Sequence, residues 1–403
     1  MPDLKQSGGG GACRVAVIWI DWYPYHVARM QGLCSAPTLS GRVSGVELVG
    51  GVGVHAGLKF RADLPGDLPV TTLMPEGNWS TANHWKLAWM LWRQLDRLNP
   101  EAVLVPGYYT LPGIAAALWA RLHGRISILM TESAAYDHAR RPGRELLKRL
   151  MLRALFDRAV VGGRDHAEYL RQLGFAPESV SRFYDVVDND YFAAGAAEAR
   201  RASSAQQHNL RERYFLYVGR LAPEKNVAGL LRAWLQYRAE GGTWDLVLAG
   251  DGPERLLLEE TLSRSEIGDS VRITGLCTAK QLLPLYAFAS AFVLASTREP
   301  WGLVVNEAMA SGLPVIATDH CGCANDLLRD SGCGEIVPVG NEPALTLALH
   351  RMAQHTPATR AAMARAARER IRDFSPWRFG LEVASVVDRI QAHAQRWPQE
   401  EAL

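Results

Sequence analysis

The chain has 403 residues, of which 48% are apolar and 21% are charged. This length and composition predict a globular protein of two domains and exclude a fibrous or disordered chain. Basic residues number 44 and acidic residues 42, so the net charge of +2 excludes a global field that would hold nucleic acid or an anionic membrane. Any phosphate group must be bound by local charges.

Residues 1–11 include four consecutive glycines and are expected to form a flexible tail, because they lack the apolar stretch of a signal peptide. No segment approaches the ~20 uncharged apolar residues that span a bilayer. Six cysteines, at positions 13, 34, 277, 321, 323 and 333, are too sparse for a disulfide scaffold. We therefore expect a cytoplasmic protein.

In the first half, apolar segments predict strands at 14–20, 101–105, 126–130 and 159–162. Between them, Trp85, Ala88, Trp89, Trp92 and Leu95 repeat at intervals of three and four, which predicts one face of a helix. We expect the three tryptophans to belong to the core, because buried aromatics are commoner than binding surfaces. The alternative is a surface for an acceptor or a membrane.

A second helical segment, at 140–155, is amphipathic. Its cations are Arg140, Arg141, Arg144, Lys148, Arg149 and Arg153, and its apolar residues are Leu146, Leu147, Leu150, Met151 and Leu155. We expect the apolar side to face the core and the basic side to face solvent. The alternative is peripheral contact with anionic lipid, which would suit a lipid-linked acceptor.

The second half predicts strands at 214–218, 245–249, 271–274, 291–295, 315–318 and 336–337, separated by helices that include a long one at 344–371. Short strands alternating with helices indicate parallel sheets covered on both faces, and two such halves predict two doubly wound domains. Residues 193–210 lack a strand pattern and suit a connector. We place the first domain at 12–205, the second at 206–375, and a last helix at 376–403, capped by Ser375 and expected to pack back toward the first domain.

Open parallel sheets bind ligands beyond the carboxyl ends of their strands. Directly after the strand at 214–218 stand Gly219, Arg220 and, five residues further, Lys225. The two cations can converge on one diphosphate, and glycine lets the backbone approach it closely. The alternative is a solvated turn whose cations point away from each other.

After the strand at 291–295, Pro300 and Gly302 precede a short helix that ends near Gly312. The free N–H groups near Gly302 and Leu303 make an anion site. Glu299 stands before this turn and Glu307 lies inside the helix. The nearby cations and helix dipole predict that both carboxylates are ionised, although either can also be an ordinary residue of the first helical turn.

These segments resemble the family 4 glycosyltransferases, which are retaining nucleotide-sugar enzymes of the GT-B fold. The resemblance is carried by FLYVGRLAPEKN (215–226), LVLAGDGPE (246–254) and STREPWGLVVNEAMASGLPVIATD (296–319). It implies two facing Rossmann-like domains with a cleft between them, and a hexosyltransferase that uses a nucleoside diphosphate sugar, expected to be a UDP-sugar. The acceptor hydroxyl is left open among a glycan, a lipid-linked sugar and a small molecule.

The resemblance also implies roles for individual residues. Arg220 and Lys225 would bind the donor diphosphate and, with Glu299, form the catalytic set. Glu307 would bind the ribose hydroxyls. The remaining donor contacts would come from Gly219, Pro300, Trp301, Gly302, Leu303 and Val304.

The first half resembles the family more loosely, because Asp21–Pro24 stands where the family has a glycine-rich loop. Candidate acceptor-binding residues lie at the predicted cleft; they are Tyr25, His26, Arg29, Glu132 and Ser133. A capped helix with a hydrogen-bonded His26 is the competing interpretation.

We expect no metal and no cofactor. Asp188 and Asp190 form the Asp-x-Asp pattern of a metal-dependent transferase fold, but their place before the connector favours a structural role. The group His320, Cys321, Cys323 and Cys333 has no common zinc-site spacing. Two other functions remain open, a nucleotide-sugar epimerase of the same fold and a non-catalytic nucleotide-sugar-binding protein.

Overall fold

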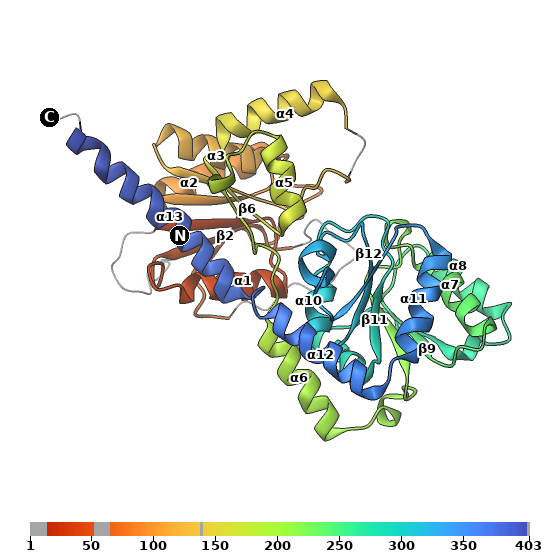
Figure 1. Cartoon of the computed structure of the whole chain (residues 1–403). Coiled ribbons are helices and arrows are strands. Elements are labelled where there is room, and N and C mark those ends of the chain that lie inside the picture. The colour runs from red at the N-terminus through yellow and green to blue at the C-terminus, as the bar shows by residue number, and fades with distance from the viewer. Residues whose placement is uncertain (1–13, 52–64, 138–139, 401–403) are drawn as a thin grey trace.

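A computed structural model describes residues 14–51, 65–137 and 140–400, and side chains are described as far as 389. The expected tail at 1–11 lies outside the described residues. Two parallel β-sheets, one in each half of the chain, are each packed between helices (Figure 1). The predicted architecture of two doubly wound parallel-sheet domains is therefore confirmed.

The first sheet has seven strands in the order β3-β2-β1-β4-β5-β6-β7. The strands are β1 Val15–Trp19, β2 Val43–Val49, β3 Val70–Met74, β4 Ala102–Pro106, β5 Ile126–Thr131, β6 Arg158–Val161 and β7 Val180–Ser181. Strands β2, β3 and β7 were not predicted. In β2 the apolar pattern that would predict a buried strand is interrupted by Glu47. This residue is fully buried and accepts a 2.6 Å hydrogen bond from the Thr72 hydroxyl of β3.

Four helices cover one face of this sheet, and two cover the other (Figure 1). The first four are α2 His84–Leu98, α3 Leu111–Leu122, α4 Pro142–Leu155 and α5 Arg164–Gln172, and the other two are α1 Pro24–Ser35 and α13 Pro376–Glu400. Ser375 directly precedes helix α13, and its hydroxyl accepts from the Arg378 N–H. It packs so closely on α1 that a Cβ at Gly32 would lie 1.9 Å from the Pro376 carbonyl oxygen.

The second sheet has the order β10-β9-β8-β11-β12-β13. Its strands are β8 Tyr214–Val218, β9 Asp245–Ala249, β10 Val271–Ile273, β11 Ala291–Leu294, β12 Val315–Thr318 and β13 Gly334–Val337. Its helices include α7 Val227–Ala239, α8 Arg255–Ser263, α9 Ala279–Phe288, α10 Leu303–Ala310, α11 Glu342–Gln354 and α12 Pro357–Ile371. The long helix expected at 344–371 is thus two helices, because Thr356 caps a new one at Pro357.

Much of the segment expected to be a connector is helical. Helix α6, Asn189–Ala202, packs against α9 and α10 of the second lobe. Phe192 and Ala196 are the buried residues that hold it there. Helix α6 precedes the domain boundary that we predicted between residues 205 and 206. Because it packs on the second lobe, the chain passes from the first lobe to the second before α6.

Two predictions about core faces are wrong in part. In α2 the buried residues are Leu87, Ala88, Leu91 and Leu95, and Trp92 is half-buried against the same core, but Trp85 is 76% exposed and Trp89 is 62% exposed. At about 100° per residue, side chains two positions apart point to nearly opposite sides of a helix, so Trp85 and Trp89 lie opposite Leu87 and Leu91.

In α4, Leu152 is fully buried and Met151 and Leu155 are half-buried against the core. The expected core residues Leu146, Leu147 and Leu150 are exposed.

In the part of the chain that the structure describes, no helix combines the length and the apolar character required to traverse a bilayer.

Candidate active site

Loops at the carboxyl ends of both sheets meet between the lobes. The Asn306 side chain donates to the Asp185 carbonyl at 3.0 Å, and the His166 ring contacts the Pro300 carbonyl at 2.8 Å. The Arg164 N–H donates to the Asp326 carboxylate at 2.7 Å. The predicted donor segment at 299–304 therefore lies against the first lobe.

Lys225 and Glu299 form an ion pair, with 2.5 Å between Nζ and Oε2. Two contacts bring their segments together: the Thr297 N–H donates to the Glu224 carbonyl at 2.9 Å, and the Asn226 side chain donates to the Ala295 carbonyl at 3.2 Å. Asn226 takes a left-handed conformation, φ 51°, which turns the chain into α7. The structure therefore brings together two of the predicted catalytic residues.

Glu299 is held from several directions. The Ser296 hydroxyl donates to its carboxylate at 3.2 Å, and its backbone is paired in a bridge with Cys321 after β12. Its side chain is 10% exposed, against 18% for Lys225. A small opening of this pair would make both charges accessible to a ligand.

Arg220 is half exposed and forms an ion pair with Glu224. Its carbonyl accepts a 2.8 Å hydrogen bond from the Tyr217 hydroxyl. The convergence of Arg220 and Lys225 on one anion stays a prediction, because Arg220 is paired here with another carboxylate.

Close backbone contact fixes the loop after β8 against the loop after β9. A Cβ at Gly250 would lie 1.8 Å from the Gly219 carbonyl oxygen, and one at Gly252 would lie 2.3 Å from the Leu221 carbonyl oxygen. Only glycine permits this approach. The GDG sequence at 250–252 therefore holds the segment that carries Arg220.

Helix α10 begins at Gly302, whose φ of 102° is unfavourable for a side chain. Trp301 before it is fully buried and donates from its ring N–H to Asn306 at 2.9 Å. Its indole thus belongs to the core between the lobes. Leu303 and Val304, the next predicted donor contacts, are half-buried at the first turn.

Glu307 differs from the expectation. Its carboxylate accepts a 2.7 Å hydrogen bond from the Tyr286 hydroxyl of α9. Burial raises the pKa of Glu307 to about 7, and the Tyr286 hydrogen bond only partly opposes this shift. Desolvation therefore opposes the predicted ionisation of Glu307.

Residues 199–370 match the family model described as glycosyl transferases group 1. Alpha-D-kanosaminyltransferase from Streptomyces kanamyceticus is 28% identical over 74% of this chain and 79% of its own length. A GDP-mannose-dependent alpha-mannosyltransferase from Mycobacterium tuberculosis is 36% identical over 37% of this chain and 38% of its own length.

Two solved structures share the fold. HepE from Anabaena, in complex with UDP, has a TM-score of 0.69 at 16% identity over 93% of this chain and all of its own. Sucrose-phosphate synthase from Thermosynechococcus elongatus has a TM-score of 0.72 at 19% identity over 94% of this chain and all of its own. The match at residues 199–370 and the shared fold support a GT-B glycosyltransferase of the group 1, family 4 type. The predicted activity, glycosyl transfer from a nucleotide sugar, is confirmed at this level.

In the first lobe of this glycosyltransferase, His26 has a structural role. Its Nδ1 accepts from the Tyr23 N–H at the start of α1, and its ring stacks on Trp19 at 4.8 Å. Burial, and then the charge of Arg29, hold the pKa of His26 well below its ordinary value. The geometry therefore favours the capped-helix interpretation over acceptor binding.

Arg29 forms a fully buried ion pair with Asp185, 2.9 Å from Nη2 to Oδ1. Its guanidinium lies over the rings of Tyr184, at 4.0 Å, and Tyr25, at 5.0 Å. Burial, followed by the charge of Glu132, raises the pKa of Asp185 well above its usual range. The candidate acceptor residues Arg29 and Glu132 therefore lie in one region of the first lobe. Their binding of an acceptor stays a prediction.

Sequence reasoning missed Asp185 and Tyr286. Asp185 follows β7, which has only two residues and gave no strand signal. Tyr286 lies on the buried side of α9, where an aromatic residue is indistinguishable from core.

The proposed structural role of Asp188 agrees with its geometry, since it caps α6 by accepting from the Tyr191 N–H at 2.9 Å. Over residues 14–51, 65–137 and 140–389, whose side chains the structure describes, no three His, Cys, Asp or Glu side chains gather in a way that could hold a metal ion.

Proposed function

We propose that this glycosyltransferase is a retaining hexosyltransferase that uses a UDP-sugar and needs neither metal nor cofactor. The observation that carries the proposal is the Lys225–Glu299 pair at the start of α10, beside the loop that bears Arg220. UDP as the nucleotide is supported by HepE structures that hold UDP and UDP-glucose. The mannosyltransferase relative uses GDP-mannose, so the base needs a direct test.

The resting ion pair suggests how the donor binds. The diphosphate would replace Glu299 as the ion-pair partner of Lys225. Arg220 and the N–H groups at the start of α10 would donate further hydrogen bonds to it. Glu299 would then be free to accept hydrogen bonds from hydroxyls of the transferred sugar. Because the two partners are only 2.5 Å apart, this exchange needs a small side-chain movement.

The chemistry follows from where charge develops. As the bond from the sugar to the diphosphate breaks, the leaving group gains negative charge. A preorganised cation and peptide N–H groups stabilise that charge without reorganising, and one such donor is typically worth about 3–4 kcal/mol. The acceptor would attack from the face that the diphosphate leaves, which retains the configuration.

By its resemblance to the family, Glu307 would bind the ribose hydroxyls of the nucleoside. With a pKa of about 7 it is partly protonated at neutral pH. A carboxylate accepts two hydroxyl hydrogen bonds better than a carboxylic acid does, so nucleotide affinity should rise with pH through this range.

A thermal-shift series tests the donor. Ligand that binds only the folded protein raises the melting temperature, so UDP-, GDP- and ADP-sugars can be ranked directly. We expect the largest shift with a UDP-sugar, without added magnesium, and its loss in Lys225→Ala. A shift that requires magnesium, or that survives in Lys225→Ala, would contradict the proposal.

Turnover separates the alternatives. Donor converted to another nucleotide sugar in the absence of acceptor would identify an epimerase, and tight donor binding without any turnover would identify a binding protein. We further propose a cytoplasmic location, because Cys321, Cys323 and Cys333 are buried free thiols. The acceptor is open among glycan, lipid-linked and small-molecule hydroxyls, and the exposed face of α4 favours the lipid-linked class.

A further inference from the structure

Helix α4 turns three of its leucines toward solvent, while Met151, Leu152 and Leu155 face the core. Leu146 is 58% exposed, Leu147 is 68% exposed and Leu150 is 60% exposed, whereas Leu152 on the opposite side is fully buried. At about 100° per residue, these three leucines lie together on the outer side of the helix. A helix that packs on a sheet normally places such residues inward. The outer side of α4 is therefore an apolar surface of the kind that binds a partner.

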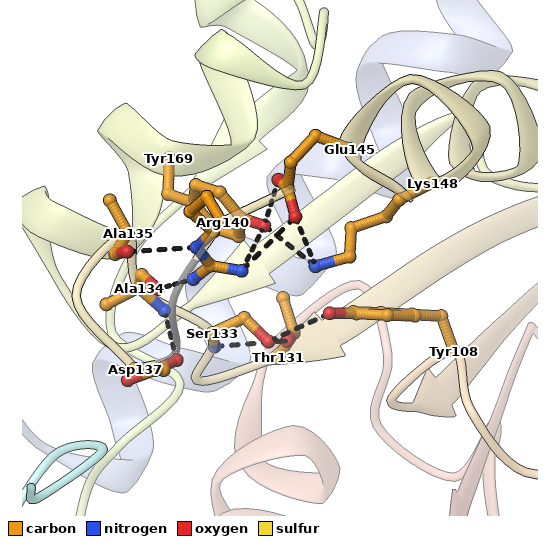
Figure 2. Close-up of polar contacts among 10 residues, drawn as sticks. All are labelled: Tyr108, Thr131, Ser133, Ala134, Ala135, Asp137, Arg140, Glu145, Lys148 and Tyr169. Atoms are coloured by element: carbon orange, nitrogen blue, oxygen red, sulfur yellow. Dashed lines mark hydrogen bonds and ion pairs between the residues drawn. The ribbon is translucent and has the colours of Figure 1, made fainter. Parts of the chain in front are cut away.

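Arginines flank the leucines. Arg149 and Arg153, one turn apart, lie along one side of the leucine stripe and Arg144 lies on the other, and all three are exposed. Among the described residues, none of these three arginines forms an ion pair with a carboxylate. In contrast, Arg140 and Lys148 turn inward and pair with Glu145 (Figure 2).

Exposed apolar residues also occur on the neighbouring helices. Trp85 and Trp89 are exposed on α2, and Leu118 and Leu122 are exposed on α3. The buried residues of α2, α3 and α4 belong to one core under the same face of the first sheet, so their exposed residues share the outer side of that layer. Tryptophan at the edge of an apolar surface suits the boundary between lipid and water.

We propose that the outer face of α4 is a docking surface for an anionic lipid bilayer. The leucines enter the boundary between headgroups and acyl chains, and Arg144, Arg149 and Arg153 contact lipid phosphates. The charge complementarity is local, because the whole chain carries a net charge of only +2. Lipid is the occupant that satisfies both features at once, since a bilayer offers phosphate beside hydrocarbon along the whole length of the helix.

The inner side of α4 connects this surface to the predicted acceptor residues (Figure 2). The Lys148 ammonium donates to the Tyr169 hydroxyl at 2.7 Å and lies 5.3 Å from the centre of the Tyr108 ring. The Tyr108 hydroxyl in turn contacts the Ser133 hydroxyl at 3.2 Å. Docking therefore brings the region of Glu132 and Ser133 to the membrane and favours a lipid-linked acceptor, a consequence that rests on the proposed function.

Vesicle flotation tests the docking. Wild-type protein should bind vesicles of 30% phosphatidylglycerol in phosphatidylcholine and not vesicles of phosphatidylcholine alone, and added salt should weaken binding. The double variant Leu147→Glu/Leu150→Glu should bind at least tenfold less. Each of Arg144→Gln, Arg149→Gln and Arg153→Gln should lower binding about fivefold.

A matched control uses exposed leucines of the other lobe. Leu256 and Leu257 on α8 are 73% and 52% exposed, and Leu256→Glu/Leu257→Glu should bind vesicles like the wild type. All variants should keep the melting temperature and the nucleotide-induced shift, because none of these side chains is buried or near Lys225. Equal vesicle binding by the α4 double variant, or no binding by the wild type, would overturn the proposal.

Two further outcomes separate the claims. A wild-type dimer that dissociates in the α4 double variant, measured by sedimentation in the absence of lipid, would make the face a contact between copies and overturn lipid docking. With the donor identified by thermal shift and a total lipid extract as acceptor, labelled sugar should enter the organic phase. Label that stays in water would reject the lipid-linked acceptor without affecting docking or donor binding.

Discussion

Each lobe contains an ion pair made by a candidate site residue, and the two pairs differ in their access to solvent. Lys225 and Glu299 in the second lobe retain side-chain exposures of 18% and 10%. Arg29 and Asp185, which join α1 to the segment after β7, are both fully buried. A pair that keeps some contact with water can exchange its partners for a ligand, whereas a fully buried pair is costly to separate. This difference supports the proposed catalytic role of the first pair and suggests that the second pair positions elements of the first lobe.

The largest expected effect comes from breaking the buried pair. Asp185→Ala removes the hydrogen-bonded partner of the buried Arg29 charge, leaves only the nearby charge of Glu132, and should destabilise the protein by about 3–5 kcal/mol. Guanidinium unfolding monitored by circular dichroism measures this loss. The double variant Arg29→Met/Asp185→Leu removes both charges and should recover most of it. If Asp185→Ala were as stable as the wild type, separating the buried pair would cost no more than separating the accessible one, and the comparison would fail.

Breaking the accessible pair should affect the reaction more than the fold. Lys225→Ala should lower kcat/KM about 10²–10³-fold, because it removes a cation that stabilises the leaving diphosphate. The melting temperature should change little, since the Glu299 carboxylate keeps a hydrogen bond from Ser296. Lys225→Arg is the control that retains the charge. Near-normal turnover by Lys225→Ala would contradict the catalytic assignment.

The backbone beneath the accessible pair provides a smaller effect. Gly250→Ala places a methyl group 1.8 Å from the Gly219 carbonyl oxygen, so the loop that carries Arg220 must move. We expect a loss of about 1–3 kcal/mol in stability and a higher KM for the donor. Gly143→Ala is a suitable control, because a Cβ there meets no atom within 4 Å. Equal KM values in both variants would rule out this role for the loop after β9.

The smallest effect depends on pH. The pKa of Glu307 rises from 4.5 to about 7 on folding, so the folded state binds the proton more tightly than the unfolded state. Stability from this group is therefore greatest below pH 4.5 and falls as the pH rises to about 7. Glu307→Gln removes this dependence and should raise the melting temperature more at pH 8 than at pH 5. An identical difference at both values would contradict the shifted pKa.

Local patterns predicted the second lobe well. The strands at 214–218, 245–249 and 315–318 have the predicted bounds, and α7 and α10 begin where the turns at Asn226 and Gly302 require. The first lobe was predicted less completely. Its strand β2 contains the buried Glu47, and its candidate His26 proved to cap a helix. Glu47 is satisfied by Thr72 of another strand, which local sequence does not identify, whereas His26 accepts from the Tyr23 N–H three residues earlier.

The sequence by itself determined the alternation of strands and helices and the position of Lys225, Glu299 and Glu307 after strands, because these depend on short-range periodicity and turn chemistry. Only the tertiary structure decided which faces are covered. It left Trp85 and Leu147 exposed, buried Arg29 with Asp185, and raised the pKa of Glu307. Periodicity shows which residues share a side of a helix, but burial and its electrostatic consequences depend on what distant segments place against that side.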